Sequence, residues 1–228
     1  MGYLIPILLA VAYGFVMMRF SAWSTKRQLT EKSRPLKDAG LDPLIGRMAE
    51  ALDLPQIKVN LYDVEMINGL AAPDGRIFIT RGFYDQYRQG AVSGEEMASV
   101  VAHELGHVAL GHTKRRMIDF SAQNAARAAL TMIIGRFIPF IGPMIANTVI
   151  SLFAAGLSRA DEYEADAYAS ALLLKSGIGL EGQKSLFRKL DALTKSRAGA
   201  APAWLLSHPK SHERIAAIEA NAAKWGVN

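Results

Sequence analysis

The stretch that decides the fold is Ser93–His107, which reads SGEEMASVVAHELGH. Ser93 and Glu96 form a capping box, in which each side chain accepts a hydrogen bond from the backbone N–H of the other residue. A helix is therefore predicted to begin directly after Ser93. Behind the cap, Met97 and Val100 start a series of apolar residues at the three- and four-residue spacing of a buried helix face.

Two histidines of this helix are predicted to point the same way. His103 and His107 are four residues apart, and residues at that spacing share one face of a helix. Their imidazoles can then reach one metal ion while Glu104 lies beside it, and His-Glu-x-x-His on a helix is the signature of zinc proteases. The chain has no cysteine, so any further ligand must be His, Asp or Glu. The alternative is a helix surface that carries two histidines by coincidence.

A second acidic segment, residues 158–166, offers the third ligand. Glu162 and Asp166 share a helix face, whereas Glu164 lies about 200° around the helix from Glu162. We expect Glu162 to bind the metal and Asp166 to accept a hydrogen bond from the other ring nitrogen of a ligand histidine. The alternative is an acidic, solvated helix start, which the helix dipole also favours. His112 lies about 140° from the second motif histidine and is expected to be an ordinary helix-end residue.

Three separated motifs resemble the HtpX-like and CAAX prenyl protease family of integral-membrane zinc metalloproteases. In chain order they are HELGHVALGH, SRADEYEADAYA and SHPKSHERI. The resemblance covers roughly residues 40–220 and implies three Zn²⁺ ligands, His103, His107 and Glu162. It also implies that Glu104 activates water as the general base, that Asp166 orients a ligand, and that His208 helps to stabilise the oxyanion. The alternative for His208 is a cap or surface residue.

The same resemblance indicates where a substrate binds. Residues Asn68, Gly69, Leu70 and Ala71 resemble the edge strand that precedes the motif helix, although the family more often has Ala or Ser where Gly69 stands. We expect protein or peptide substrates to bind there as an added β-strand. Because that mode contacts the main chain, sequence selectivity should be loose.

The remaining pattern favours an α+β fold, mainly helical with a small antiparallel or mixed β-sheet. Alternating apolar residues predict a small meander of strands between about 57 and 80. Helical spacing predicts the other elements, helices over 41–54, 158–174 and 180–195 and a last helix from Pro209 onward.

Two hydrophobic segments indicate contact with membrane lipids. Met1–Met18 has no charged side chain and a basic flank, which predicts an N-terminal transmembrane anchor helix with the rest of the chain in the cytoplasm. The alternative is a buried helix. Residues 128–157 carry only one charge, Arg136, yet lie between the predicted ligands, so both ends must be on one side of the membrane. We expect a helical hairpin that dips into the membrane or packs on its own domain. The alternatives are two thin spans or ordinary core helices.

The expected organisation is an anchor over 1–20, a linker over 21–40 and a zinc metalloprotease domain over 41–228. The hydrophobic content of 50% excludes a disordered chain. The net charge of +5 is mild and dispersed, so no nucleic-acid partner is expected.

The expected function is that of a membrane-anchored zinc metalloendopeptidase in the bacterial inner membrane, acting in membrane-protein quality control or processing. One rival is a zinc hydrolase of another bond class. The other is a non-proteolytic adaptor or chaperone with a structural zinc site.

Overall fold

The computed structural model describes the chain in several stretches. They are residues 12, 15–16, 19–20, 23–24, 26–72, 74–112, 115–116, 142–196 and 211–226. Two compact units are present: unit 1 is Met1–Glu31 with His112–Ala160, and unit 2 is Lys32–Gly111 with Asp161–Asn228. All three predicted metal ligands belong to unit 2.

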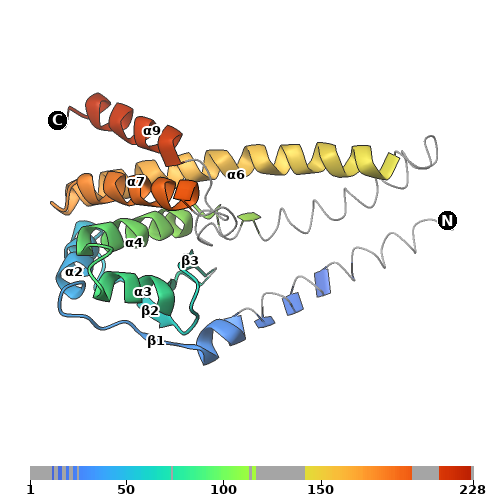
Figure 1. Ribbon diagram of the computed structural model, residues 1–228. Helices are drawn as coiled ribbons and strands as arrows, with labels where there is room; N and C mark the ends of the chain where they lie inside the picture. The colour runs from blue at the N-terminus through green and yellow to red at the C-terminus, as the bar shows by residue number, and fades with distance from the viewer. Residues whose placement is uncertain are drawn as a thin grey trace. The chain divides into compact units, whose positions relative to one another are not determined.

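Unit 2 contains a mixed sheet of four strands (Figure 1). They are β1 (Ser33–Pro35), β2 (Val59–Tyr62), β3 (Gly69–Ala71) and β4 (Ile77–Thr80). The spatial order is β1-β2-β4-β3, with β2 and β4 parallel and the other neighbours antiparallel. The expected mixed sheet is confirmed. The expected meander is wrong, because β4 and not β3 lies beside β2.

The central position of β4 follows from its sequence. All four of its residues are completely buried, and a continuous apolar run is typical of a strand that is covered on both faces. β3 is shorter and contains Gly69, which suits the edge. Thr80 fixes the start of this edge, because its hydroxyl contacts the backbone N and O of Asn68, each at 2.9 Å. The Thr80 N–H also donates to the Asn68 carbonyl at 3.0 Å.

The helices of the described residues beyond residue 41 are α2 (Asp42–Ala51), α3 (Arg81–Arg88), α4 (Gly94–Ala109), α6 (Gly142–Lys175), α7 (Glu181–Ser196) and α9 (Ser211–Lys224). Of these, α3 and α4 pack against strands of the sheet. The capping box of α4 is confirmed: the Glu96 N–H donates to Ser93 Oγ at 3.2 Å, and the Ser93 N–H donates to Glu96 Oε2 at 2.8 Å. Every residue of α4 from Glu96 to His107 is buried, so this helix is the centre of unit 2.

Helix α6 begins earlier than predicted. Its start at Gly142 makes residues 142–157 helical, in continuity with the acidic segment that follows. The predicted start near residue 158 is therefore wrong. Residues 128–141, the other half of the predicted hairpin, lie outside the described residues, and the hairpin stays a prediction.

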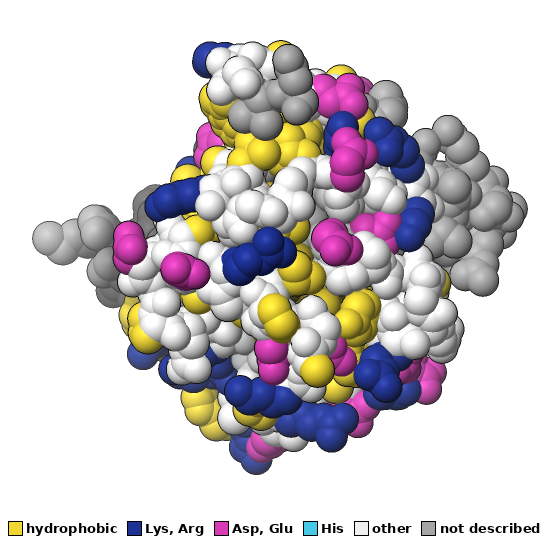
Figure 2. Space-filling model, turned by 90° about the vertical axis from the view of Figure 1, so that its left-hand side faces the viewer, with side chains coloured by type: hydrophobic (Ala, Val, Ile, Leu, Met, Phe, Trp, Pro, Cys, Tyr) yellow, Lys and Arg dark blue, Asp and Glu magenta, His cyan; other side chains and the backbone are white. Residues whose placement is uncertain are grey.

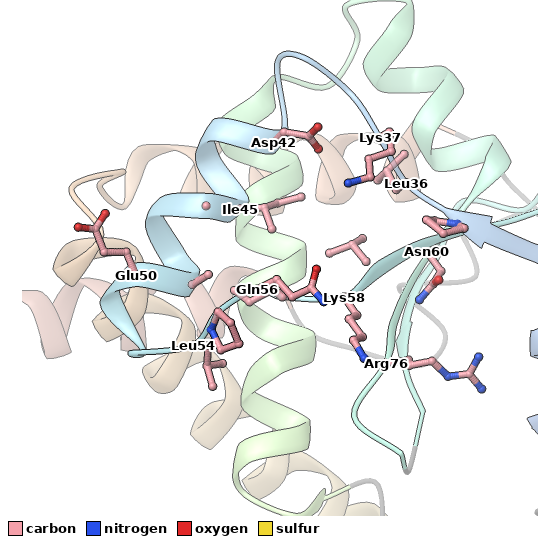
Figure 3. A pocket seen from close by; sticks show the side chains of 16 residues that line it. Leu36, Lys37, Asp42, Ile45, Glu50, Leu54, Gln56, Lys58, Asn60 and Arg76 are labelled. Atoms are coloured by element: carbon pink, nitrogen blue, oxygen red, sulfur yellow. The ribbon is translucent and has the colours of Figure 1, made fainter.

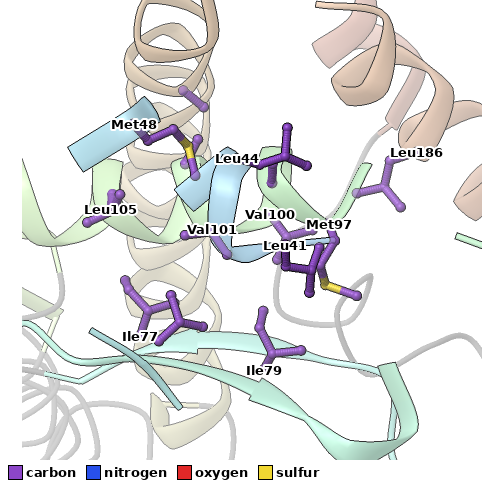
Figure 4. Close-up of a cluster of buried hydrophobic side chains, with 14 of the residues drawn as sticks. Leu41, Leu44, Met48, Ile77, Ile79, Met97, Val100, Val101, Leu105 and Leu186 are labelled. Carbon is purple, nitrogen blue, oxygen red and sulfur yellow. The ribbon is translucent and has the colours of Figure 1, made fainter. Parts of the chain in front are cut away.

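The core of unit 2 holds α4 against its neighbours. Figure 1 shows α4 between α7 and the sheet, and α4 contacts both α7 and β3. In Figure 4, Ile77 and Ile79 of β4 lie below Val100 and Val101 of α4, and Met48 of α2 belongs to the same buried cluster. Burying each such side chain stabilises a fold by about 1.5–3 kcal/mol. Helix α4 is thus a fixed platform for the residues it carries.

Unit 1 is described in parts. Every described residue between 12 and 31 is helical, and Phe15, Phe20 and Trp23 are exposed there. Most of the predicted anchor, 1–20, lies outside the described residues. None of the helices that the described residues form is both long and apolar enough to cross a membrane. The anchor, the linker and the domain boundaries stay predictions.

The visible face of the molecule in Figure 2 carries both signs of charge. Lys and Arg side chains are interspersed there with Asp and Glu and with apolar patches. Ion pairs are found among the exposed side chains, such as Arg81 Nε with Asp63 Oδ1 at 2.7 Å.

Candidate active site

Helices α4 and α6 bring three predicted ligands together. His103 and His107 come from one face of α4, and Glu162 comes from α6. The Nε2 atoms of the two histidines lie 3.1 Å apart. Glu162 Oε2 lies 3.3 Å from His103 Nε2, and Glu162 Oε1 lies 3.4 Å from His107 Nε2. All three side chains are buried, at 2–3% exposure.

Gly106 allows the two helices to approach this closely. A Cβ atom at Gly106 would lie 2.9 Å from the carbonyl oxygen of Ala165 and 3.0 Å from its Cα. Backbone atoms of a packed helix cannot move aside for a methyl group. The glycine inside the His-Glu-x-x-His motif therefore sets the spacing between the histidines and Glu162.

The donor set fits a metal ion. Two imidazole nitrogens and one carboxylate oxygen suit zinc and neighbouring first-row metals, whereas calcium and magnesium prefer oxygen ligands alone. Ligands in a tetrahedron at about 2.0–2.1 Å from zinc lie about 3.3–3.4 Å from one another. The observed separations of 3.1–3.4 Å are close to that spacing. Zinc catalytic sites typically have three protein ligands and one open position.

Asp166 orients the first ligand from behind. The Nδ1 atom of His103 lies 2.9 Å from Asp166 Oδ1. We assign a proton to Nδ1 from this contact, so that in the neutral imidazole the lone pair of Nε2 points toward the other two predicted ligands. Glu164, between the two acidic residues of this helix, is exposed. The predicted helical phase of Glu162, Glu164 and Asp166 is confirmed.

Arg214 of α9 completes this arrangement. Its Nε and Nη2 atoms bind the two oxygens of Asp166 at 2.5 and 2.6 Å, a bidentate pair. Its Nη1 lies 3.6 Å from Glu162 Oε2, and its Cζ lies 4.4 Å from the centre of the Phe187 ring. The side chain is 1% exposed. Arg214 therefore balances the charge of Asp166 inside the protein.

These contacts shift the ionisation of the buried groups. Burial raises the pKa of Asp166, but the charge and hydrogen bonds of Arg214 outweigh it and hold that pKa below its ordinary value. Burial lowers the pKa of His103, but its contacts with Asp166 and Glu162 outweigh it and raise that pKa to about 9. Asp166 is thus held as a carboxylate beside His103.

Glu104, which follows His103 on α4, lies beside the edge strand β3. It shares a face of α4 with Val100, four residues earlier, and it is 2% exposed. A Cβ atom at Gly69 of β3 would lie 3.6 Å from Glu104 Oε1. The structure therefore brings the predicted base and the predicted substrate strand, residues 68–71, together.

The other predicted residues have different outcomes. His208 lies outside the described residues. His112 is fully buried, and it is absent from the metal-binding group found among the described residues. Arg214 was missed, although helical phase carried a signal: it lies four residues before Ile218, which is also fully buried.

A groove of about 780 Å³ lies elsewhere in unit 2 (Figure 3). It is lined by α2, by the segment that follows it and by β2, with Ile45, Leu54 and Lys58 among the lining residues. None of the three predicted metal ligands lines it. We therefore take the buried group, and not this groove, as the candidate active site.

Known proteins share this sequence pattern. Metalloprotease LoiP of Escherichia coli is 29% identical over 171 residues, which cover 75% of this chain and 65% of LoiP. Metalloprotease YcaL of the same organism is 30% identical over 158 residues, covering 69% of this chain and 59% of YcaL. A protease HtpX homolog of Salinibacter ruber is 25% identical, covering 98% of this chain and 89% of that protein. The chain thus spans less than two thirds of the length of LoiP and YcaL.

A solved structure shares the fold. The crystal structure of Ste24p from S. mikatae matches with a TM-score of 0.50 at 21% identity, over 91% of this chain and 58% of that one. At this identity the likeness shows the fold alone. The model of peptidase family M48 matches residues 35–222, which contain strands β2 to β4, the parts of α4 and α6 that carry the predicted ligands, and nearly all of α9. The chain belongs to peptidase family M48.

Proposed function

We propose that this chain is a zinc metalloendopeptidase that hydrolyses peptide bonds in protein substrates. The observation that carries the proposal is that the Nε2 atoms of His103 and His107 and the carboxylate oxygens of Glu162 lie 3.1–3.4 Å apart. Glu104 directly follows His103 on the same helix. Family membership supports the peptidase activity. The donor set supports zinc.

In the proposed reaction, four side chains act together with the zinc ion. Zinc, when bound, supplies a Lewis acid that polarises the scissile carbonyl and lowers the pKa of water. Glu104 accepts a proton from the attacking water and later delivers it to the leaving amine. Asp166 holds the ring of His103 in one tautomer, and Arg214 keeps Asp166 ionised. His208 donates a hydrogen bond to the developing oxyanion.

The substrate is proposed to bind as a strand on the outer edge of β3. In the described part of the chain, β3 pairs with β4 on one side and with no strand on the other. An extended peptide can use these backbone groups, and Glu104 lies next to them. Recognition through the main chain gives loose sequence selectivity.

The proposed location is the bacterial inner membrane, with the catalytic unit on the cytoplasmic side. The uncharged segment Met1–Met18, its basic flank and the apolar segment 128–157 support contact with lipids. Such a location suits quality control of membrane proteins or processing of a precursor.

Two other functions are less well supported. A zinc hydrolase of another bond class would have the same ligands and base, but family M48 membership favours peptide bonds. A non-proteolytic adaptor would require a structural zinc, which is normally closed by four protein ligands. The group found among the described residues has three.

The test is Glu104→Gln in the full chain. We expect wild-type zinc content and loss of cleavage of casein and of a model membrane protein, because only the proton acceptor is removed. Glu164→Gln, an exposed change on α6, is the matched control and should keep full activity. Full turnover by zinc-loaded Glu104→Gln would exclude Glu104 as the base.

A further inference from the structure

The edge strand β3 packs against the motif helix α4, and Gly69 lies at this contact. Gly69 is buried, and a Cβ atom added to it would lie 2.6 Å from Val100 Cγ1 on α4. The φ angle of Gly69 is not positive, so an alanine could adopt its backbone conformation. In this chain glycine therefore leaves room for the Val100 side chain, and the backbone of β3 lies directly on α4.

Val100 cannot easily give way. It is 1% exposed in the core, and a valine in a helix strongly prefers one χ1 rotamer. A methyl group at residue 69 would have to displace the strand by about 0.8 Å to bring the 2.6 Å contact to an ordinary 3.4 Å. The strand yields more readily than the helix, because β3 is short and at the edge.

Val100 and Glu104 belong to the same face of α4, one turn apart. The contact that fixes the strand is therefore next to the carboxylate that is proposed to take the proton from water. A Cβ atom at Gly69 would lie 3.6 Å from both Cγ and Oε1 of Glu104. Any shift of the strand at Gly69 changes the distance between a bound substrate and Glu104.

We propose that Gly69, through its contact with Val100, is a positioning residue that sets the distance between the substrate-binding edge and Glu104. This inference rests on the proposed function, since it concerns how the scissile bond meets the base. Gly69→Ala leaves the hydrogen-bonding groups of β3 intact and moves them outward. A displacement of about 1 Å in the reacting geometry costs about 10² in rate. The loss should therefore fall on kcat and spare KM.

The experiment is a double-mutant cycle in the full chain, with peptide cleavage and zinc content measured for each variant. Gly69→Ala should lower kcat by about 10- to 100-fold with KM and zinc content nearly unchanged. Val100→Ala should have a small effect, and Gly69→Ala/Val100→Ala should recover most of the wild-type kcat because Cγ1 is gone. Gly46→Ala is the matched control, since a Cβ atom at Gly46 meets nothing within 4 Å.

The outcomes separate this inference from the proposed function. Wild-type kcat in Gly69→Ala, or a double variant as slow as Gly69→Ala, overturns the inference while wild-type cleavage still stands. Absence of cleavage by the wild-type chain overturns the proposed function itself. If Gly69→Ala does not fold, the double variant decides: near-wild-type kcat supports the inference, and a folded, zinc-loaded but slow protein overturns it.

Discussion

Two polar clusters of unit 2, one partly buried around Asp38 and one buried around His103, differ in how donors and acceptors are paired. At Asp38, one carboxylate accepts hydrogen bonds from the hydroxyls of Tyr84 and Tyr87 at 2.7 and 3.0 Å. The backbone N–H groups of Gly40 and Leu41 donate to it at 2.9 and 3.2 Å. Each of these contacts joins one donor to one acceptor, so the cluster needs nothing from outside.

In the candidate metal site, formed by His103, His107 and Glu162, acceptors face acceptors. His103 uses Nδ1 toward Asp166, so its Nε2 is the nitrogen that faces His107 and Glu162. When the imidazoles are neutral and the carboxylate is ionised, lone pairs converge within 3.1–3.4 Å. A cation satisfies all of them at once. The comparison teaches that a cluster of matched pairs stabilises a fold by itself, whereas converging lone pairs favour the binding of a cation.

The largest expected effect comes from removing one of the converging ligands. Glu162→Ala should lower zinc affinity by orders of magnitude, while Glu164→Ala, on the exposed face of the same helix, should change it little. Zinc bound per chain after dialysis measures both. A chelator should also lower the Tm of the wild type and leave that of Glu162→Ala unchanged, because a ligand stabilises only the fold that binds it. Equal zinc loss in both variants would show that Glu162 is not the third ligand.

The second-largest effect is expected from removing the positive charge of Arg214, which pairs with Asp166 behind the candidate metal site. Arg214→Met leaves Asp166 buried without its partner, and breaking a buried pair in this way typically destabilises a protein by about 3–5 kcal/mol. Urea unfolding measures it. Arg188→Met, an exposed arginine of α7, is the control and should be nearly neutral. An equal loss of unfolding free energy in the two variants would mean that the buried Arg214–Asp166 pair contributes no more to stability than an exposed arginine does.

A smaller effect is expected where the two ligand-bearing helices touch. Gly106→Ala forces a methyl group against the backbone of Ala165, and overpacking of this kind costs about 1–3 kcal/mol. Because the same contact sets the ligand spacing, zinc affinity should fall together with stability. Gly46→Ala, again the control, should stabilise slightly. Unchanged zinc affinity in Gly106→Ala would separate the helix contact from the ligand geometry.

The smallest effect is expected in the self-matched cluster, and it depends on pH. Burial raises the pKa of Asp38, but hydrogen bonds from Tyr84, Gly40 and Tyr87 outweigh it and hold that pKa below its ordinary value. The stabilisation is therefore present above the unfolded pKa of about 3.9 and is lost as pH falls through the lower folded pKa.

Asp38→Asn should remove this acid-dependent part, with a cost of about 1–2 kcal/mol at pH 7, since hydrogen bonds to charged groups contribute somewhat more than neutral ones. Unfolding free energy measured from pH 7 to pH 3 gives the comparison. The exposed Asp63→Asn should change the profile little. Equal acid sensitivity in wild type and Asp38→Asn would refute a role for this carboxylate.

The site was predictable where local helix geometry decides it. The four-residue spacing of His103 and His107 and the phase of Glu162 against Glu164 follow from 3.6 residues per turn, whatever the rest of the fold does. The capping box at Ser93 is equally local. Such features depend on neighbours within one turn, and all of them are confirmed.

Features that depend on distant segments were not predictable in the same way. The placement of β4 between β2 and β3 requires a choice among strand pairings that local alternation does not distinguish. Arg214 is drawn into the interior by Asp166, 48 residues earlier, and an arginine is ordinarily expected at the surface. The need for glycine at residue 106 likewise exists only once α6 lies against α4.

The shortness of β3 has a consequence for the behaviour of the protein in solution. An unpaired strand edge is a template on which another copy of the same chain can add, and such additions lead to aggregates. β3 offers only the backbone of Gly69–Ala71, and an identical edge on a second copy is equally short. Two folded copies therefore gain few hydrogen bonds by pairing, whereas a flexible peptide can extend past the strand and gain contacts beyond it. A short edge of this kind thus limits self-association and is compatible with the proposed binding of a substrate strand.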